Sequence, residues 1–334
     1  MKFDIHLNVG TIYKTNSSRS KELFYTGKEI ADYCNFYKIT HCVCIYSHYQ
    51  YIEELQLHAP NTKVYGVQWI TDFANNKFDI GKPLFQGIKL HSNRGYRMVN
   101  GELTYGLDYG DFNLVESVLN KLPDNHLVYM HTGCNILGNK TSLRCSPDHV
   151  FTLATKYNNL KFIMGHAGVY GGMFTSEPSI REVPTTITNN SHVYTAGVRN
   201  HVNSMASTKK AVMYANYTHN IFLDGSIHTR DKARELKNTP KWAVGSDYPY
   251  GYNREDNFTE IDFKDNYTWD YNFQCRQYEK RIGNIDHTHK NAIKFIETNI
   301  IDLAKEHGEF YTRVKGSKSF CHNYYSLENE YFSE

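Results

Sequence analysis

Short apolar runs recur along the chain, and several of them end on a polar residue that is followed by a turn. Residues 242–244 (Trp-Ala-Val) lead through Gly245 and Ser246 to Asp247, and Pro249 then prevents a longer strand. The runs at 3–10, 126–133 and 160–168 have the same form. This pattern predicts buried strands that each present a polar side chain at the carboxyl end.

Eight such strands alternate with mostly helical connections. Strands are expected at 3–9, 41–47, 64–70, 85–93, 126–131, 161–166, 220–226 and 242–247. Helices are expected at about 22–36, 51–58, 111–122, 147–157, 208–217, 230–238 and 288–305, and a polar loop at 15–22. The alternation predicts an α/β fold, and eight units favour a closed (β/α)8 TIM barrel over an open sheet.

Two irregular segments interrupt this alternation. Residues 169–203 read as a long insertion after the sixth strand, and 248–283 as a long connection, part loop and part helix, after the eighth. We expect one barrel domain over residues 1–307 with a C-terminal helix. Residues 308–334 are expected to form a polar, Tyr-rich tail that either packs on the barrel or is mobile.

Composition narrows the class of protein. The chain has 334 residues, of which 40% are hydrophobic, and 37 basic and 35 acidic residues give a net charge of +2. This balance provides no basic surface for nucleic acid, and no apolar run is long enough to span a membrane. The seven cysteines contain no Cys-x-x-Cys pair, and a strand begins at once without a signal peptide. We expect a cytoplasmic protein with a small-molecule substrate, and homo-oligomerisation stays open.

The strand ends carry the candidate chemistry. In a parallel barrel the carboxyl ends of all strands meet at one mouth, so His6, His131, His166 and Asp247 are expected to converge there. Two or three neutral imidazoles and one carboxylate suit a single divalent ion, Zn²⁺ or alternatively Mn²⁺, with an open position for water. Asp247 would then bind the ion and accept a proton from the water. A lone histidine at a strand end is more often structural, but four such ends together are unlike a chance pattern.

The strand-end motifs resemble a known family. The segments DIHLN, GIKLH, MHTG, GHAG, GSDYPYG and NAIKFI are similar to those of the amidohydrolase superfamily, in its amidohydrolase-related (type 2) branch of metal-dependent TIM-barrel hydrolases and decarboxylases. The resemblance covers most of the chain. The family's first-strand motif is Asp-x-His-x-His, whereas this chain has Asp4, His6 and then Asn8.

The resemblance implies roles for individual residues. It makes His6, His131 and Asp247 metal ligands, and Asn8 a weaker ligand through its neutral oxygen. Asp247 is also the family's proton shuttle. His166 matches a histidine that binds the metal or orients the substrate and the hydrolytic water.

Four further residues are expected to line the mouth and contact the substrate. Lys89 and His91 lie two positions apart on the fourth strand and share one face, and Trp69 and Tyr248 are at the ends of other strands. Lys89 either faces the substrate or an ion-pair partner, or is carbamylated and bridges two metals. His91 either contacts the substrate or makes a structural hydrogen bond.

Two other groups of residues are expected to have structural roles, and a third is a candidate for substrate binding. Asp224, on the seventh strand, is expected to anchor hydrogen bonds rather than to catalyse, and Cys42 and Cys44 to be small core residues. Arg94 and Arg199 are candidates for binding a substrate carboxylate.

The sequence therefore predicts a hydrolase that activates water against an ester, lactone or amide carbonyl. A decarboxylase of an aromatic or muconate-like acid is the alternative within the same fold. A barrel that has lost its metal and binds a ligand or a protein without turnover is the third reading, and Asn8 supports it. Fold alone does not separate them, because TIM barrels host many reactions.

Overall fold

The structure is a computed structural model that describes ten stretches of the chain. They are residues 1–16, 19–70, 77–91, 96–99, 102–105, 112–132, 147–168, 208–226, 230–249 and 271–315.

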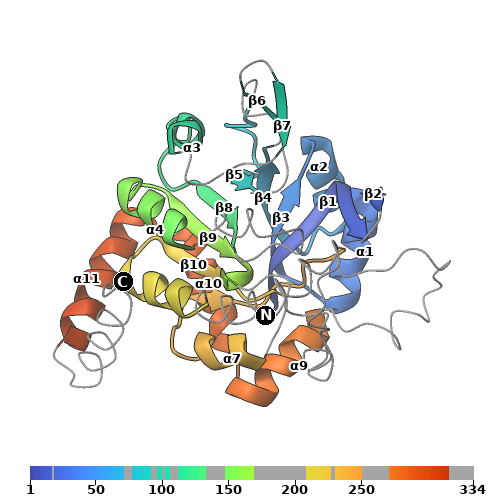
Figure 1. The fold of residues 1–334 in the computed structure, drawn as a ribbon. Helices are drawn as coiled ribbons and strands as arrows, with labels where there is room; N and C mark the ends of the chain where they lie inside the picture. Colours follow the sequence, from blue (N-terminus) through green and yellow to red (C-terminus); the bar gives the residue numbers. More distant parts are fainter. Residues whose placement is uncertain are drawn as a thin grey trace, which may run out of the picture.

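Eight parallel strands form a closed barrel (Figure 1). The sheet has the order β11-β10-β9-β8-β5-β4-β3-β1-β2, and every neighbouring pair except β1 and β2 is parallel. The two ends of the parallel series meet. The Ile5 N–H donates to the Val244 carbonyl (3.1 Å), and the Asn8 N–H donates to the Tyr248 carbonyl (2.9 Å). The predicted (β/α)8 barrel is thus confirmed.

All eight barrel strands lie where the apolar runs predict them. They are β1 (Phe3–Asn16), β3 (His41–Tyr46), β4 (Lys63–Trp69), β5 (Phe85–Leu90), β8 (Leu127–His131), β9 (Lys161–Gly165), β10 (Ile221–Asp224) and β11 (Trp242–Ala243). Their residues are mostly buried on both faces, which explains why they read as apolar runs rather than as an alternating pattern.

Helices cover the outer face of the barrel, as the sequence predicts. They are α1 (Gly27–Tyr37), α2 (Tyr49–His58), α3 (Phe112–Leu119), α4 (Pro147–Lys156), a helix at 208–217, α7 (Arg230–Leu236) and α9 (Tyr271–Ile282). No helix in the described stretches is long and apolar enough to cross a membrane. The expected insertion at 169–203 lies outside the described residues.

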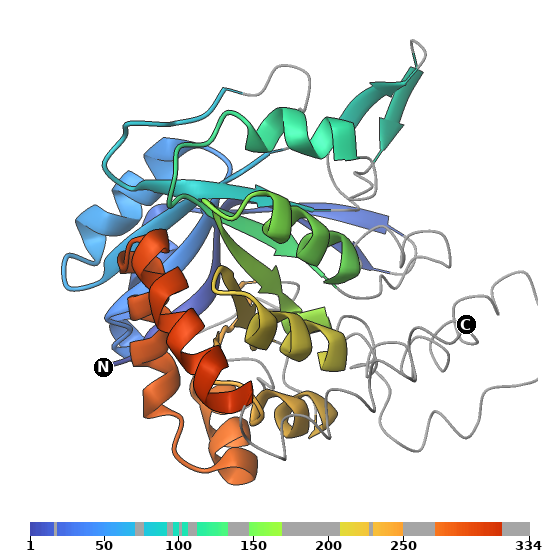
Figure 2. The ribbon, with the colours of Figure 1, turned by 90° about the vertical axis from the view of Figure 1, so that its left-hand side faces the viewer.

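Two hairpins were not predicted. β1 continues beyond Val9 and pairs antiparallel with β2 (Arg19–Tyr25), so the expected loop at 15–22 and the expected helix start near residue 22 are wrong. The helix α1 begins after Thr26, because Thr26 and Glu29 form a reciprocal capping box. The second hairpin, β6 (Tyr96–Val99) with β7 (Glu102–Tyr105), projects away from the barrel in Figures 1 and 2.

An irregularity in β1 turns the site residues inward. The pairing of β1 with β3 shifts register between Asp4 and Leu7. Before the shift, Ile5 packs in the cluster that fills the barrel, whereas Leu7 after it packs in the cluster beneath the helices. The extra residue of a bulge changes which positions face inward. His6 and Asn8 therefore point into the mouth of the barrel.

Two C-terminal helices close the opposite end of the barrel, where the strands begin (Figure 2). The single helix predicted at 288–305 is two helices, α10 (Asp286–Glu297) and α11 (Ile300–Lys315), because the chain is extended at Thr298. Lys161 donates to the Ile296 carbonyl (2.6 Å), and the Ile300 N–H donates to Asn125 Oδ1 (2.6 Å). Helix α11 continues past residue 308, where the tail was expected to start, and residues 316–334 lie outside the described part.

Acid is expected to weaken the packing of α10 through His289. Burial lowers the pKa of His289 to about 4, so between pH 6.5 and pH 4 the unfolded chain binds a proton that the folded chain does not. The stability that rests on neutral, buried His289 is fully present above pH 6.5. As the pH falls towards 4, the free energy of unfolding decreases by about 1.4 kcal/mol per pH unit. Urea unfolding at pH 7, 6 and 5 measures it. His289→Leu should lose stability less steeply than wild type, and parallel slopes would contradict the prediction.

Candidate active site at the carboxyl ends of the strands

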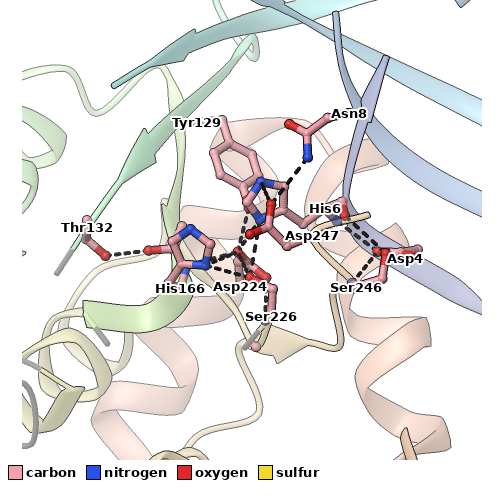
Figure 3. Close-up of polar contacts among 12 residues, drawn as sticks. Asp4, His6, Asn8, Tyr129, Thr132, His166, Asp224, Ser226, Ser246 and Asp247 are labelled. Carbon is pink, nitrogen blue, oxygen red and sulfur yellow. Dashed lines mark hydrogen bonds and ion pairs between the residues drawn. The ribbon is translucent and has the colours of Figure 1, made fainter. Parts of the chain in front are cut away.

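Polar side chains from five strands meet at the mouth of the barrel (Figure 3). His6 comes from β1, His131 ends β8, His166 follows β9, Asp224 ends β10 and Asp247 follows β11. All five are buried, each with at most 6% of its surface exposed. The convergence expected from the strand ends is therefore present in the structure.

Asp224 is the centre of the hydrogen-bond network. Its Oδ2 accepts hydrogen bonds from the Tyr129 hydroxyl (2.6 Å), the His166 backbone N–H (2.8 Å) and His6 Nδ1 (2.9 Å). The Ser226 hydroxyl donates to the same oxygen, and the Ser226 N–H donates to Oδ1, both at 2.6 Å. Burial alone would raise the pKa of Asp224, but His6, His166 and these donors outweigh it and hold the pKa well below its usual value.

This carboxylate fixes the tautomers of two histidines. Because an ionised carboxylate only accepts, His6 Nδ1 must carry a proton; in the neutral form of the ring, Nε2, which lies 3.2 Å from Asp247 Oδ1, then carries the lone pair. Ser226 donates its hydroxyl proton to Asp224 and so accepts from His166 Nδ1, at 2.8 Å. His166 Nε2 therefore also carries a lone pair. Its pKa is held well below the usual value, first by burial and then by the neighbouring His131 and His6.

A metal ion fits this arrangement. Within the described part of the chain, His6, His166 and Asp247 form a group whose possible ligand atoms all lie within 4.8 Å of one another. Two imidazole nitrogens with lone pairs and one carboxylate are the donor set of catalytic zinc sites, and a carboxylate behind a ligating histidine is their usual support. This donor set thus suits a divalent metal ion.

Asn8 contacts Asp247 through its amide nitrogen. Asn8 Nδ2 donates to Asp247 Oδ1 (3.3 Å) and to the Tyr248 carbonyl (3.3 Å). Both partners only accept, so they select the nitrogen over the oxygen that the sequence reading assigned to the metal. Asn8 thus orients the carboxylate of Asp247 through Nδ2, and metal binding through its Oδ1 stays a prediction.

His131 lies beside the group formed by His6, His166 and Asp247. Its ring centroid is 4.7 Å from that of His166 in an edge-on arrangement, and 4.1 Å from that of His91, on which it stacks. Trp69 lies behind His91, with 6.2 Å between their ring centroids. The structure therefore joins these predicted residues into one aromatic wall beside the grouped donors, and metal binding by His131 stays a prediction.

Two buried lysines lie close to this network. Lys89 Nζ is 3.9 Å from the centroid of the Tyr129 ring, and Lys232 Nζ donates to the Ser226 carbonyl (2.5 Å). Burial lowers the pKa of each to about 7, while Asp224 and Asp247 favour the charged forms. Sequence reasoning missed Lys232, because it lies in a charged segment that resembles an exposed helix.

The ring of Tyr248 does not face the other site residues. It stacks on Tyr33 of α1, with 3.9 Å between centroids and an interplanar angle of 10°, and it is 8% exposed. Its carbonyl contacts the site instead, by accepting from Asn8. The candidates Arg94 and Arg199 lie outside the described residues.

Left-handed backbone is concentrated at the site. His166 (φ 61°), Ala167 (φ 46°) and Asp247 (φ 54°) all have positive φ. Such conformations cost on the order of 1 kcal/mol or more for residues with a Cβ, and they persist where the surrounding structure enforces them. The turn after each strand thereby directs His166 and Asp247 at the same point.

Gly245 is expected to be required for this packing. A Cβ on Gly245 would lie 2.6 Å from Asp224 Oδ1, 2.9 Å from His6 Cβ and 3.0 Å from Ser226 Cβ. Gly245→Ala should therefore destabilise the fold by about 1–3 kcal/mol and displace the site. Gly308→Ala is the matched control. It adds a methyl group to α11 with no atom within 4 Å, so it should stabilise by about 1 kcal/mol. Equal urea midpoints for the two variants would contradict the prediction.

Comparisons with known proteins give likenesses in three dimensions only. No known protein family and no curated protein matches the sequence. A crystal structure of a probable 2-pyrone-4,6-dicarboxylic acid hydrolase from Acinetobacter baumannii, with citric acid bound, matches at 12% identity and a TM-score of 0.49, over 89% of this chain and 99% of that one. An amidohydrolase from Burkholderia multivorans with bound HEPES matches at 8% identity and a TM-score of 0.47, over 89% and 99%.

A third likeness is to a TIM-barrel protein. An uncharacterized TIM-barrel protein from Bordetella bronchiseptica matches at 11% identity and a TM-score of 0.38, over 88% of this chain and 76% of that one. At these identities the likeness concerns the fold and not the reaction. The three matches are therefore likenesses alone.

Proposed function

We propose that this protein is a metal-dependent hydrolase that cleaves an ester, lactone or amide bond of a small molecule. The observation that supports this most directly is the convergence of His6, His166 and Asp247, with possible ligand atoms within 4.8 Å of one another. These three residues would hold one divalent ion, Zn²⁺ or alternatively Mn²⁺. Such an ion, when bound, polarises a carbonyl and lowers the pKa of water.

Asp247 is the residue proposed to take the proton from the attacking water and to pass it to the leaving group. Burial raises the pKa of this carboxyl group, while His6, Lys89 and Asn8 act in the opposite direction. A carboxylate with a raised pKa is a stronger base than an exposed aspartate. The hydrogen bond from Asn8 would keep one oxygen of the carboxylate in a fixed orientation.

Lys89 favours an acidic substrate. Its amino group is buried in the mouth, and burial disfavours the charged form. A substrate carboxylate beside it would add negative charge and so stabilise the ammonium form. The same contact supports the second candidate function, decarboxylation of an aromatic or muconate-like acid. In that reaction the bond to the carboxyl carbon breaks and carbon dioxide leaves, whereas hydrolysis keeps every carbon in the products.

Metal binding is the first test. We expect metal-free protein to take up one equivalent of Zn²⁺ or Mn²⁺, as measured by calorimetry and elemental analysis. His166→Ala should lose this binding, and His58→Ala, which removes an exposed histidine of α2, should keep it. If His131→Ala lost metal binding and His166→Ala kept it, His131 would be the metal ligand in place of His166. A wild-type protein that binds neither ion would overturn the proposal and favour the metal-free binding barrel.

Product analysis separates the two reactions. The metal-loaded protein would be incubated with a panel of carboxylated lactones, esters and amides and of aromatic acids. Hydrolysis of an ester or lactone should release one proton per bond cleaved, which a pH-stat records, and hydrolysis of an amide should release its amine. Decarboxylation should take up a proton in place of the carboxylate and release carbon dioxide. Turnover of an acid with carbon dioxide release and no hydrolysis across the panel would select the second candidate.

A further inference from the structure

A cavity lies at the opposite end of the barrel from the proposed active site. It has a volume of about 180 Å³, is open to the surface and is lined by the end of the 208–217 helix, the starts of β10 and β11, and the helices α10 and α11. Its lining consists of Asn216, His219, Phe222, Pro240, Lys241, Asn291, Lys294, Phe295, Leu303, Glu306 and His307. This volume is below the 300–1,000 Å³ of typical drug-sized pockets, so an occupant would be small.

Part of the lining is apolar and aromatic. The rings of Phe222 and Phe295 stack with 4.9 Å between centroids and an interplanar angle of 25°, and Leu303 packs in the same core cluster. Pro240 adds a further apolar surface. Such a surface suits a flat, compact apolar group.

Lys241 supplies a positive charge on the wall of this cavity. Its Nζ donates to the Thr218 carbonyl and lies 3.4 Å from His307 Nδ1. His307 Nε2 donates to the Tyr217 carbonyl (3.0 Å), so Nδ1 carries a lone pair and His307 is neutral. Burial lowers the pKa of His307 to about 4, so both hydrogen-bond partners of the ammonium group are uncharged acceptors.

Within the described part of the chain, no carboxylate forms an ion pair with Lys241. The acid of the cavity lining, Glu306, is paired with Lys294 at 2.6 Å. Burial lowers the pKa of Lys241 to about 7, with no acidic group acting against it. An ammonium group that is withdrawn from water and faces only neutral acceptors is expected to gain from a bound anion.

We propose that this cavity is a binding site for a small monocarboxylic acid with a compact aromatic body. The carboxylate would lie against Lys241 Nζ and the ring against Phe222 and Phe295. The site is separate from the proposed active site, because its lining comes from the starts of β10 and β11 and from α10 and α11, whereas Asp224 and Asp247 lie at the carboxyl ends of those two strands. The proposal does not depend on a metal or on the hydrolase activity.

Calorimetry with benzoate tests the proposal, with benzyl alcohol as the neutral probe of similar shape. Wild type should bind benzoate more tightly than benzyl alcohol. Lys241→Met, which keeps an apolar stem and removes the charge, should weaken benzoate binding at least tenfold, whereas Lys241→Arg should retain most of it. Lys290→Met, which removes an exposed positive charge of α10 outside the lining, is the matched control and should bind as wild type does. Absence of benzoate binding at millimolar concentration, or equal binding by wild type and Lys241→Met, would overturn the proposal.

A measurement on the unaltered chain covers the case in which Lys241→Met fails to fold. In protein labelled with ¹³C at lysine Cε, the pH dependence of the Lys241 NMR signal gives the pKa of its amino group. Saturating benzoate should raise this pKa, because an anion stabilises the charged form. Benzyl alcohol should not raise it. Benzoate binding that disappears in Asp247→Ala and leaves the Lys241 pKa unchanged would place the acid at the mouth of the barrel and refute the second site.

Discussion

Asp247→Asn is expected to reduce the metal-dependent hydrolysis rate by about 100- to 10,000-fold, the range that a positioned general base contributes. The substitution removes the anionic donor of the proposed metal group and the group that accepts the water proton. The side chain keeps its shape, and asparagine tolerates the left-handed backbone at this position, where φ is 54°. The loss should therefore appear in catalysis and metal affinity rather than in folding.

The measurement combines kcat/KM with the dissociation constant for Zn²⁺ and the urea midpoint. Because burial raises the pKa of Asp247, its charge does not favour the metal-free fold, so the midpoint without metal should stay at or above that of wild type. Asp302→Asn, which neutralises an exposed acid of α11, controls for the change in net charge and should leave all three quantities unchanged. Full activity in Asp247→Asn would remove this residue from the mechanism.

The barrel was predictable because its strands are unusual in the chain. A strand buried on both faces must be a short apolar run, and the residue that ends it is polar because it faces the mouth. His6, His131, His166 and Asp247 could therefore be chosen without knowledge of the packing. The prediction needs only the run and the residue that ends it.

The hydrogen-bond network of the site was not predictable from the sequence. Asp224 was correctly read as a hydrogen-bond anchor, but nothing in its local pattern shows that Ser226, two positions later, connects it to His166. The amide orientation of Asn8 depends on two acceptors, Asp247 and Tyr248, that are distant in sequence. Such contacts are set by tertiary packing, for which the spacing of residues along the chain gives no signal.

The errors in secondary structure have local causes. The polar segment at 15–22 resembles a loop, because the strand pairing of β1 with β2 continues beyond the barrel, where apolar residues are not required. The break between α10 and α11 lies at Thr298 and Asn299, inside an apolar pattern that stays in phase across it. Ile300 and Leu303 reach the same core cluster as Phe295, so the periodicity conceals the break.

Asp224→Asn is expected to remove the hydrogen-bond acceptor that orients His6 and His166. It should also destabilise the fold by about 3–5 kcal/mol, as the loss of a buried ionic partner does. The carboxylate accepts from donors on both oxygens: four on Oδ2 and the Ser226 N–H on Oδ1. An asparagine amide must present its NH₂ to one of these two sets. Either orientation places donor against donor in a buried position.

The same substitution should weaken Zn²⁺ binding by about 10- to 100-fold, the usual cost of losing the partner that orients ligating histidines. Ser226→Ala provides the graded comparison. It removes the connection to His166 but leaves the direct bond from His6 to Asp224, so its loss of affinity should be smaller than that of Asp224→Asn. Calorimetric Zn²⁺ titrations of the folded variants rank the two. If Ser226→Ala weakened binding as much as Asp224→Asn, orientation of His166 alone would control affinity, and His6 would not need its carboxylate partner.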